Sequence, residues 1–348
     1  MTYVRNSWYV AAWSHDIAVA KPHAMQILGD RLVIYRSEAG KLAVLEDRCV
    51  HRLAPLSLGR CEGERLRCMY HGLLFDPDGR VVEIPGQDMI PDQARVRAYP
   101  AVERHNWVWV WMGTPDRADE TLIPAAVGLD HPDYLLAHGQ LDYAAEAQLI
   151  NDNLLDFSHL SFVHADSFKL GPEPAATQAS ITPIEHGIRY RRWIEALSSN
   201  GAGMPDVPAD AYMAYDFLIP GVLLMAISSW PLGTAKRLDH GHPADLSEAV
   251  RDVAFTSQAV TPMGDKSARY FFSIGPHRAF GDDAMRDAMM AMVRKAFEED
   301  RRMIEAQQRV IEATPQIRIM PTAHDRTLTM FKAKVERLAR ADARTASV

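Results

Sequence analysis

Cys49-Val50-His51 and Cys68-Met69-Tyr70-His71 are the two stretches that decide the fold of this chain, and sixteen residues separate them. Each stretch pairs one cysteine with one histidine, so together they offer two thiolates and two imidazoles. Both groups are metal ligands in proteins. The surrounding scaffold therefore has to hold two loops next to each other around a metal centre.

The mixture of ligands indicates which metal centre this is. In a Rieske [2Fe–2S] cluster two histidines replace two cysteines on one iron, which raises the reduction potential. Cys49 and Cys68 would hold one iron, and His51 and His71 the other. A zinc site is the alternative, because zinc also takes two cysteines and two histidines. Zinc fingers usually pair Cys with Cys and His with His, so one of each per loop favours the Rieske cluster.

The residues that flank the four ligands are also distinctive. Arg52-Leu53-Ala54-Pro55-Leu56-Ser57-Leu58-Gly59 follows the first pair, and Tyr70-His71-Gly72 closes the second. These loops resemble the Rieske loops of ring-hydroxylating and O-demethylating oxygenases. Val50 stands where that motif usually has proline, which affects the stiffness of the loop and not its ligands.

Composition limits the possible classes of protein. The 348 residues are 47% hydrophobic and carry a net charge of −7, enough for a buried core and about two domains. Three cysteines argue against a disulfide scaffold. The charge gives no general attraction to nucleic acid. No run of eighteen apolar residues occurs and the N-terminus lacks a signal pattern, so we expect a cytoplasmic protein with no membrane contact.

The pattern of apolar residues divides the chain into two domains. Short β-branched and aromatic runs at 32–35, 41–45 and 107–111 predict an antiparallel β domain over residues 1–115, which carries the cluster loops. Gly113-Thr114-Pro115-Asp116 marks its end. Residues 116–348 should form an α+β catalytic domain with a helix-flanked antiparallel sheet. Its expected strands are 187–197, 211–230 and 249–261, and its expected helices are 144–165, 285–311 and 327–341.

A second group of possible ligands lies in residues 151–164. Asn153, Asp156 and His159 are three residues apart, so they would share one side of a helix. His164 is five residues beyond His159, which turns it about 140° away on an ideal helix. Both imidazoles could bind one ion only if the helix ends or bulges between them, for example at a π-bulge. Two unrelated core histidines are the alternative, and the nearby carboxylate and amide favour a metal site.

Two histidines need a third protein ligand for a facial triad, the arrangement of non-haem Fe(II) oxygenases. The helix expected over 285–311 offers Glu298, Glu299 and Asp300. At about 100° per residue, Asp300 lies about 20° from the apolar stripe, whereas both glutamates project away from it. A carboxylate on a buried stripe is costly unless paired or bound to metal, so Asp300 is the expected ligand and an inward salt bridge the alternative. The stripe contains Val293, Phe297, Ile304 and Ile311.

With both sites in view, the chain resembles the oxygenase component of Rieske non-haem iron monooxygenases, in particular the vanillate O-demethylase and dicamba monooxygenase group. The resemblance covers nearly the whole chain. Besides the two cluster loops, it rests on Asn6-Ser7-Trp8-Tyr9-Val10-Ala11, Trp109-Val110-Trp111, the segment from Asp152 to His164, and Glu299-Asp300.

The resemblance implies a role for each candidate residue. Asp156 would connect His159 to the cluster ligand His71 of a neighbouring subunit, and Asn153 would lie beside the iron. The family is typically a homotrimer, which brings cluster and iron of different subunits together. The cluster ligands would be Cys49, His51, Cys68 and His71, and the Fe(II) ligands His159, His164 and Asp300.

The resemblance also implies a reaction with O₂. A separate reductase, directly or through a ferredoxin, would deliver electrons from NAD(P)H, for which this chain shows no glycine-rich binding fingerprint. One oxygen atom would enter a small aromatic compound, and an O-methyl carbon would leave as formaldehyde, as in aromatic catabolism. An apolar pocket is expected from Leu160, Met225, Ile227 and Phe272, and Met225 and Gln258 stand where relatives that take aromatic acids need polar groups. The alternatives are a dihydroxylating ring dioxygenase, an electron-transfer Rieske protein and a zinc protein.

Five arginines crowd the cluster segment although the chain is acidic overall. They suggest a docking surface for an acidic electron donor, because opposite charges speed encounter. A solvated surface neutralised by neighbouring glutamates and aspartate is the alternative. The five are Arg48, Arg52, Arg60, Arg65 and Arg67.

Overall fold

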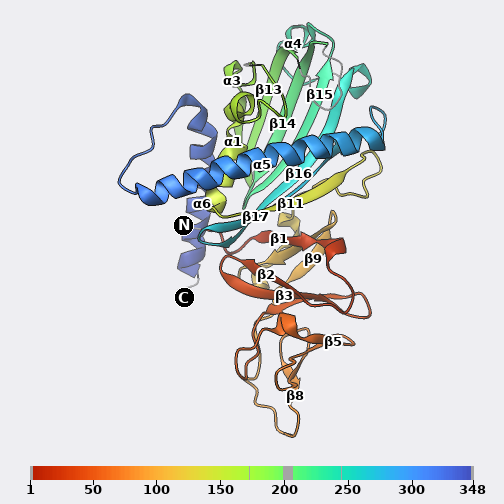
Figure 1. The fold of residues 1–348 in the computed structure, drawn as a ribbon, viewed down its shortest axis with the longest axis vertical. Helices are drawn as coiled ribbons and strands as arrows, with labels where there is room; N and C mark the ends of the chain where they lie inside the picture. The colour runs from red at the N-terminus through yellow and green to blue at the C-terminus, as the bar shows by residue number, and fades with distance from the viewer. Residues whose placement is uncertain (1–2, 172, 199–206, 244, 346–348) are drawn as a thin grey trace. The chain divides into compact units, whose positions relative to one another are not determined.

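The computed structural model describes residues 3–171, 173–198, 207–243 and 245–345. The chain forms two compact units. The first contains Tyr3–Ile123 together with Thr261–Asp265, and the second contains Pro124–Val260 and the chain from Lys266 onward. Figure 1 shows the elements of both units.

The first unit is built from three small antiparallel sheets, with strand orders β1-β10-β9, β2-β3-β4 and β5-β6-β7-β8. The strands are β1 (Trp8–Trp13), β2 (His23–Ile27), β3 (Asp30–Arg36), β4 (Leu42–Glu46), β5 (Arg60–Glu62), β6 (Arg65–Arg67), β7 (Leu74–Phe75), β8 (Val81–Glu83), β9 (Ala101–Arg104) and β10 (Trp107–Trp111). Its short 3₁₀ turns are η1 (Ser14–Asp16), η2 (Leu56–Leu58), η3 (Pro115–Arg117) and η4 (Glu120–Leu122). The predicted N-terminal β domain is confirmed.

The tryptophans of β10 hold this unit together. All five residues of β10 are buried, and two cross-strand indole pairs join β10 to β1: Trp8 with Trp111 and Trp13 with Trp107. The ring centroids are 5.5 Å apart in both pairs. Such pairs are each worth about 0.5–1.5 kcal/mol beyond the area they bury. Val108 packs on the opposite face, in a core cluster with β2 and β3.

The second unit is a seven-stranded sheet with helices against it, in the order β11-β17-β16-β15-β14-β13-β12. The strands are β11 (Ala137–Tyr143), β12 (Ser180–Ile184), β13 (Gly187–Leu197), β14 (Ala209–Leu218), β15 (Val222–Trp230), β16 (Arg251–Gly264) and β17 (Ser267–Pro276). The helices are α1 (Ala147–Leu155), α2 (Leu160–Val163), α3 (Glu173–Ala176), α4 (Thr234–Arg237), α5 (Asp283–Ala313) and α6 (Arg326–Thr345). The 3₁₀ turns are η5 (Phe157–His159), η6 (Leu246–Glu248) and η7 (Ala323–Asp325). The predicted α+β class is confirmed.

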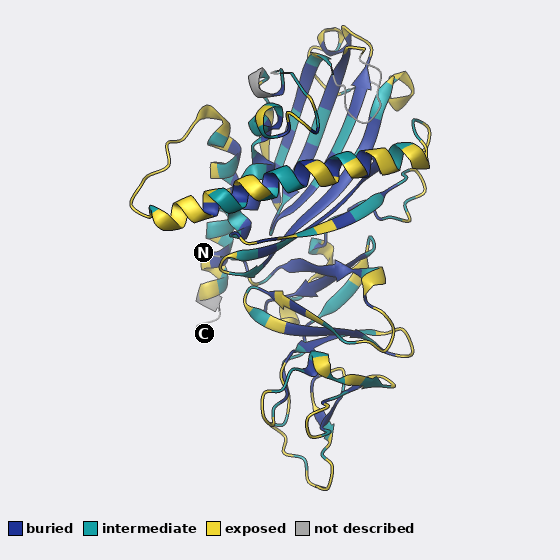
Figure 2. Ribbon diagram, viewed as in Figure 1, coloured by how far each residue is buried: buried dark blue, intermediate teal, exposed yellow. Residues whose placement is uncertain are grey.

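Helix α5 lies across one face of this sheet (Figure 1). The Asp282 side chain caps its start by accepting a hydrogen bond from Met285 N at 2.9 Å. Figure 2 shows buried and exposed residues alternating along α5, as expected of a helix with one apolar face. Ile311, expected on the buried stripe, is 36% exposed, because the helix continues past the edge of the sheet before it ends at Ala313.

No helix among the described residues combines the length and the apolar character that crossing a lipid bilayer requires.

Candidate metal centres

The first cysteine–histidine loop is shaped by its own backbone. The Cys49 amide donates to the Ala54 carbonyl at 2.8 Å, and the Cys49 carbonyl accepts from the Leu53 amide at 3.0 Å. Leu53 has a positive φ of 58°, which is uncommon for a residue other than glycine. The loop therefore folds back on Cys49 and leaves the side chain of His51 outside.

The second loop repeats this geometry with different residues. The Cys68 amide donates to the Leu73 carbonyl at 2.9 Å, and the Cys68 carbonyl accepts from the Gly72 amide at 3.0 Å. Gly72 has a φ of 79°, and a Cβ there would lie 2.8 Å from Cγ of Pro85, so only glycine fits. Two loops with the same hydrogen-bond pattern present their cysteines in equivalent positions.

The four side chains are brought together as the sequence predicts. Cys49 and Cys68 are buried at 2% and 1% exposure, whereas His51 and His71 are exposed with ring centroids 4.4 Å apart. Burial, and then the neighbouring Cys68, raise the pKa of the Cys49 thiol. Two adjacent buried thiols can both ionise only if a cation compensates them, as iron does. Desolvation, and then His51 and Arg52, lower the pKa of His71, which favours the neutral imidazole that binds metal.

The second group of ligands begins where α1 ends. The sequence predicts one helix over 144–165, and the structure contradicts its continuity. The condition that a helix ends or bulges between His159 and His164 is met, because α2 ends at Val163. Helix α1 stops at Leu155, Asp156 is extended, and η5 and α2 follow. The cause is local: Oδ1 of Asp156 accepts a hydrogen bond from Ser158 N at 2.8 Å and starts a new turn. The first break therefore lies before both histidines, and a second helix end, at Val163, lies between them.

After this break, three side chains converge as a possible triad. His159 Nε2 lies 3.6 Å from Oδ1 of Asp300, and His164 Nε2 lies 3.3 Å from Oδ2. One ligand atom from each residue lies within 4.8 Å of the others. Asp300 comes from α5 and is 4% exposed, as the helical periodicity predicted. Two imidazoles and one carboxylate with open sides form the donor set of a non-haem Fe(II) site.

Each imidazole is held with its Nε2 towards the triad. His159 Nδ1 donates to the backbone carbonyl of Asp156 at 2.6 Å. His164 Nδ1 donates to Oε2 of Glu299 at 3.1 Å, and Ser167 Oγ donates to the same oxygen at 2.6 Å. Such outer hydrogen bonds fix the tautomer and leave the other nitrogen for metal. The donor set and its orientation both fit a mononuclear iron.

Burial affects the two imidazoles differently. Burial lowers the pKa of His159, despite the opposing charge of Asp300, so its neutral form is favoured. Burial also lowers the pKa of His164, but the hydrogen bonds and charges of Asp300 and Glu299 outweigh it and raise the pKa overall. A cation in the triad would take over the stabilisation of the two carboxylates.

Helical periodicity assigns no role to Glu299, because its side chain projects away from the buried stripe. In the structure its carboxylate reaches back to His164 and Ser167, beside α5. The projection describes only which side of α5 packs on the sheet. The segment that contains His164 packs on another side of α5. The periodicity of the α5 sequence cannot predict this contact, because it depends on a separate segment.

Asn153 and Asp156 also lie at this site. Asn153 Nδ2 donates to Oδ1 of Asp300 at 3.0 Å and lies 3.3 Å from Nε2 of His159. Asp156 is connected to His159 through its backbone carbonyl, while one oxygen of its carboxylate binds Ser158. All five residues expected around the second metal are therefore neighbours in the structure.

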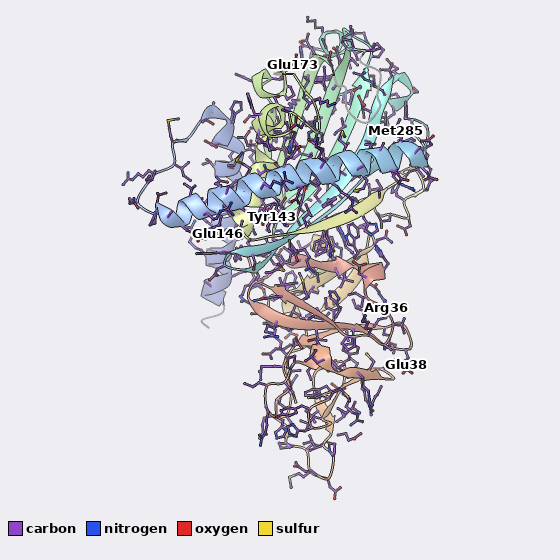
Figure 3. The ribbon with its side chains drawn as sticks, viewed as in Figure 1. Arg36, Glu38, Tyr143, Glu146, Glu173 and Met285 are labelled. Atoms are coloured by element: carbon purple, nitrogen blue, oxygen red, sulfur yellow. The ribbon has the colours of Figure 1, made fainter. Side chains whose placement is uncertain are left out.

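A cavity of about 210 Å³ opens beside the triad, between α5 and the sheet. An engineered apolar cavity of about 150 Å³ holds benzene, so one substituted ring fits here. Its wall is mainly apolar and includes Leu160, Met225 and Ile227, as expected, with Gln258. Several members come from α5, starting at Met285, which Figure 3 labels near the beginning of that helix.

Phe272, which was expected in this wall, is not part of it. Its ring packs against Phe297 with centroids 4.9 Å apart, and Phe297 lines the cavity in its place. Gln258 is held inside the wall, because its Oε1 accepts from Tyr270 Oη at 2.6 Å and its Nε2 donates to Thr256 Oγ1 at 3.0 Å.

Comparison with known proteins agrees with this geometry. Residues 7–100 match the Rieske [2Fe-2S] domain, and residues 143–341 match the vanillate O-demethylase oxygenase C-terminal domain. The iron-sulfur subunit of the toluene-4-sulfonate monooxygenase system of Comamonas testosteroni is 35% identical over 98% of both chains. A vanillate O-demethylase oxygenase subunit from a Pseudomonas species is 33% identical over 91% of this chain and 96% of its own.

A solved structure of similar fold extends the comparison to three dimensions. The crystal structure of dicamba monooxygenase bound to dicamba matches 99% of both chains with a TM-score of 0.86 and 28% sequence identity. Another structure of that enzyme contains non-haem iron and dicamba, and it matches with a TM-score of 0.79 and 26% identity.

Proposed function

We propose a reaction and a role for each site residue from one premise: the chain belongs to the Rieske oxygenase components whose C-terminal domain is of the vanillate O-demethylase type. It is the oxygenase component of a Rieske monooxygenase, and it holds a [2Fe–2S] cluster and a mononuclear non-haem iron. We propose residues 1–115 as the electron-accepting domain and 116–348 as the catalytic domain.

The proposed reaction is insertion of one oxygen atom into a small aromatic compound, by O-demethylation or hydroxylation. The observation that carries this proposal is the position of the triad in the wall of a mainly apolar cavity with room for one ring. When bound, the two metal centres supply electron transfer and the activation of O₂. The cavity supplies a dry, apolar surface that positions the substrate carbon next to the triad.

The site residues then divide by task. Cys49, Cys68, His51 and His71 would hold the cluster, and the exposure of the two histidines leaves that edge accessible to a neighbouring subunit. His159, His164 and Asp300 would hold the iron. Asn153 and Asp156 act on these ligands.

Asn153 positions Asp300 through its amide hydrogen bond. The Asp156 carbonyl orients His159, and we propose that its carboxylate meets His71 of a neighbouring subunit in a homotrimer. That contact would give electrons a short path between chains. A reductase, directly or through a ferredoxin, would deliver the electrons in the cytoplasm.

The reaction can be tested with 4-methylanisole, because that compound offers an O-methyl and a ring methyl group in one molecule. The holoenzyme, a reductase, NADH and ¹⁸O₂ should consume one O₂ per two electrons and release one oxygen atom as water. O-demethylation gives 4-methylphenol and labelled formaldehyde, whereas hydroxylation of the ring methyl gives labelled 4-methoxybenzyl alcohol. A ring diol with both labelled atoms would overturn the proposal in favour of a dioxygenase, and an intact Rieske spectrum without oxygen insertion would indicate an electron-transfer protein.

A further inference from the structure

The described wall of the cavity beside the triad offers no cationic side chain that would hold an acid. Among the described residues that line it, none is a lysine or an arginine. The histidines of the wall, His159 and His164, are the proposed iron ligands. An anionic group away from the triad would therefore lose its water without gaining a side chain of opposite charge, which is costly.

The wall instead presents a carboxylate, that of Asp252 on β16. The register of β15 and β16 shifts here: Ile227 pairs with Ala254, but Ser229 pairs with Arg251. One residue on β15 thus faces two on β16, which is a β-bulge, and Asp252 has a positive φ of 57° within it. Consecutive residues of a regular strand point to opposite faces, yet Asp252, Val253 and Ala254 all line the cavity. The bulge turns the carboxylate into the wall.

The contacts of Asp252 leave it able to accept a hydrogen bond from a ligand. Ser229 Oγ donates to Oδ2 at 2.8 Å, and Arg251 Nε lies 3.2 Å from the same oxygen. Both of the contacts described for this carboxylate are made by Oδ2. The side chain is 23% exposed, so Oδ1 can still be reached.

Arg251 is the positively charged residue next to Asp252, so it is the candidate for holding an anionic substrate. Its position argues against that role. Its side chain does not belong to the described lining of the cavity, and Nη2 donates to the Leu197 carbonyl at 3.1 Å. Its Nε lies 3.2 Å from Oδ2 of Asp252 and partly compensates that carboxylate. The described lining of the cavity includes the hydrogen-bond acceptor Asp252 and does not include Arg251.

We propose that this cavity selects a substrate with no anionic group, whose polar end donates a hydrogen bond to Asp252. The donor is an uncharged hydroxyl or an ammonium group on an apolar ring. This inference rests on the proposed function, because the cavity is taken as the substrate site. The inferred substrate class, which has no anionic group, differs from the toluene-4-sulfonate and vanillate for which two relatives are named, because both of those compounds are anions.

Binding to the holoenzyme tests the proposal without turnover, by calorimetry in the absence of O₂ and reductase. Four probes share one ring and differ at the polar end: 4-methoxybenzyl alcohol, 4-methoxybenzylamine, 4-methoxybenzoate and 4-methylanisole. The alcohol or the amine should bind at least tenfold more tightly than 4-methylanisole, and the benzoate most weakly. If the benzoate binds more tightly than both donors, or if neither donor exceeds 4-methylanisole, the proposal is overturned.

Substitution of Asp252 locates the effect. Asp252→Asn should weaken binding of the amine at least tenfold and strengthen binding of the benzoate, with cluster spectrum and iron content unchanged. Asp216→Asn is the matched control, because Asp216 lies on the same sheet, pairs with Arg189 at 2.7 Å and does not line the cavity. Tight benzoate binding that disappears in Arg251→Gln would show that the arginine forms an anion site, against the proposal.

These experiments distinguish failure of the inferred substrate class from failure of the proposed function. If the donors bind as expected but neither 4-methylanisole nor 4-methoxybenzyl alcohol gives an oxygenated product, the binding preference stands and the proposed reaction fails. If product forms but the benzoate is the tightest ligand, the reaction stands and the inferred substrate class fails.

Discussion

The two candidate metal sites are constructed in opposite ways. The cluster ligands come from one short stretch, 49–71, and each loop closes on itself through backbone hydrogen bonds. The mononuclear site joins groups that are far apart, such as Asn153 and Asp300, which are 147 residues apart in the chain. Its imidazoles are oriented by a backbone carbonyl and by a carboxylate of α5. A locally closed site shows in the sequence as a motif, whereas a site assembled across the fold shows only as separate candidates.

The largest expected effect comes from removing the carboxylate that α5 contributes. Asp300→Ala should abolish turnover and lower the iron content from about three to about two per chain, because only the cluster iron remains. The Rieske absorption should not change. Glu298→Ala is the control, since that side chain pairs with Arg301 and is not part of the triad. Iron loss in the control with full iron in Asp300→Ala would refute the assignment.

The locally closed site can be changed without touching the other. His71→Cys, where a cluster still assembles, should lower the reduction potential from the Rieske range, about −150 to +300 mV, towards the plant-type value of about −400 mV. Mononuclear iron should remain at the wild-type level. Protein-film voltammetry and iron analysis measure both quantities. A brown protein with unchanged potential would show that His71 is not a cluster ligand.

A smaller effect is expected at the residue that the sequence did not assign. Glu299→Gln keeps the shape but weakens the acceptor that orients His164, so affinity for the mononuclear iron should fall about 10–100-fold. Titration of the apo-form with Fe(II) gives a binding isotherm from which this affinity is measured. Glu298→Gln makes the same chemical change one residue away and should leave the affinity unchanged. Equal losses in both variants would indicate a general effect of charge on α5.

The connection between the two sites can be tested at Asp156. Asp156→Asn preserves the turn, because asparagine also accepts the hydrogen bond from Ser158 N, and the backbone carbonyl that holds His159 remains. Both metals should stay bound, while electron passage from cluster to iron slows. Single-turnover stopped-flow absorption would follow oxidation of the cluster, with Asp152→Asn as the neighbouring control. Passage at the wild-type rate would remove the proposed role of the carboxylate.

The smallest effect is expected on the surface near the cluster loops. In the structure Arg60 pairs with Glu62 and Arg67 with Glu62 and Glu83, whereas Arg65 is exposed on β6. Arg65→Glu should reduce the rate of cluster reduction by an acidic donor by a few-fold at low salt, and the difference should disappear as salt screens it. Arg318→Glu, an exposed position in the other unit, makes the same change of net charge. A salt-independent rate would favour the solvated-surface alternative.

Much of the fold could be predicted because its pattern is periodic. Strands β3, β4, β10 and β13 and helices α5 and α6 follow from apolar spacing, and the periodicity of α5 also placed Asp300 inside. Strand β11 could not be predicted in this way. Its sequence Ala-His-Gly-Gln-Leu-Asp-Tyr lacks clean alternation, and it is a strand because it pairs with β17.

The sequence by itself determined the α+β class and predicted the candidate cluster ligands and the carboxylate of the candidate triad, because these follow from residue spacing within single loops, strands and helices. Only the tertiary structure decided three other features: the contact of Glu299 with His164, the bulge that turns Asp252 into the cavity, and the exchange of Phe272 for Phe297 in its wall. The physical reason is the same in each case. Strand register and the packing of separate elements depend on partners distant in the chain, and these fix where a side chain points after its own helix or strand has formed.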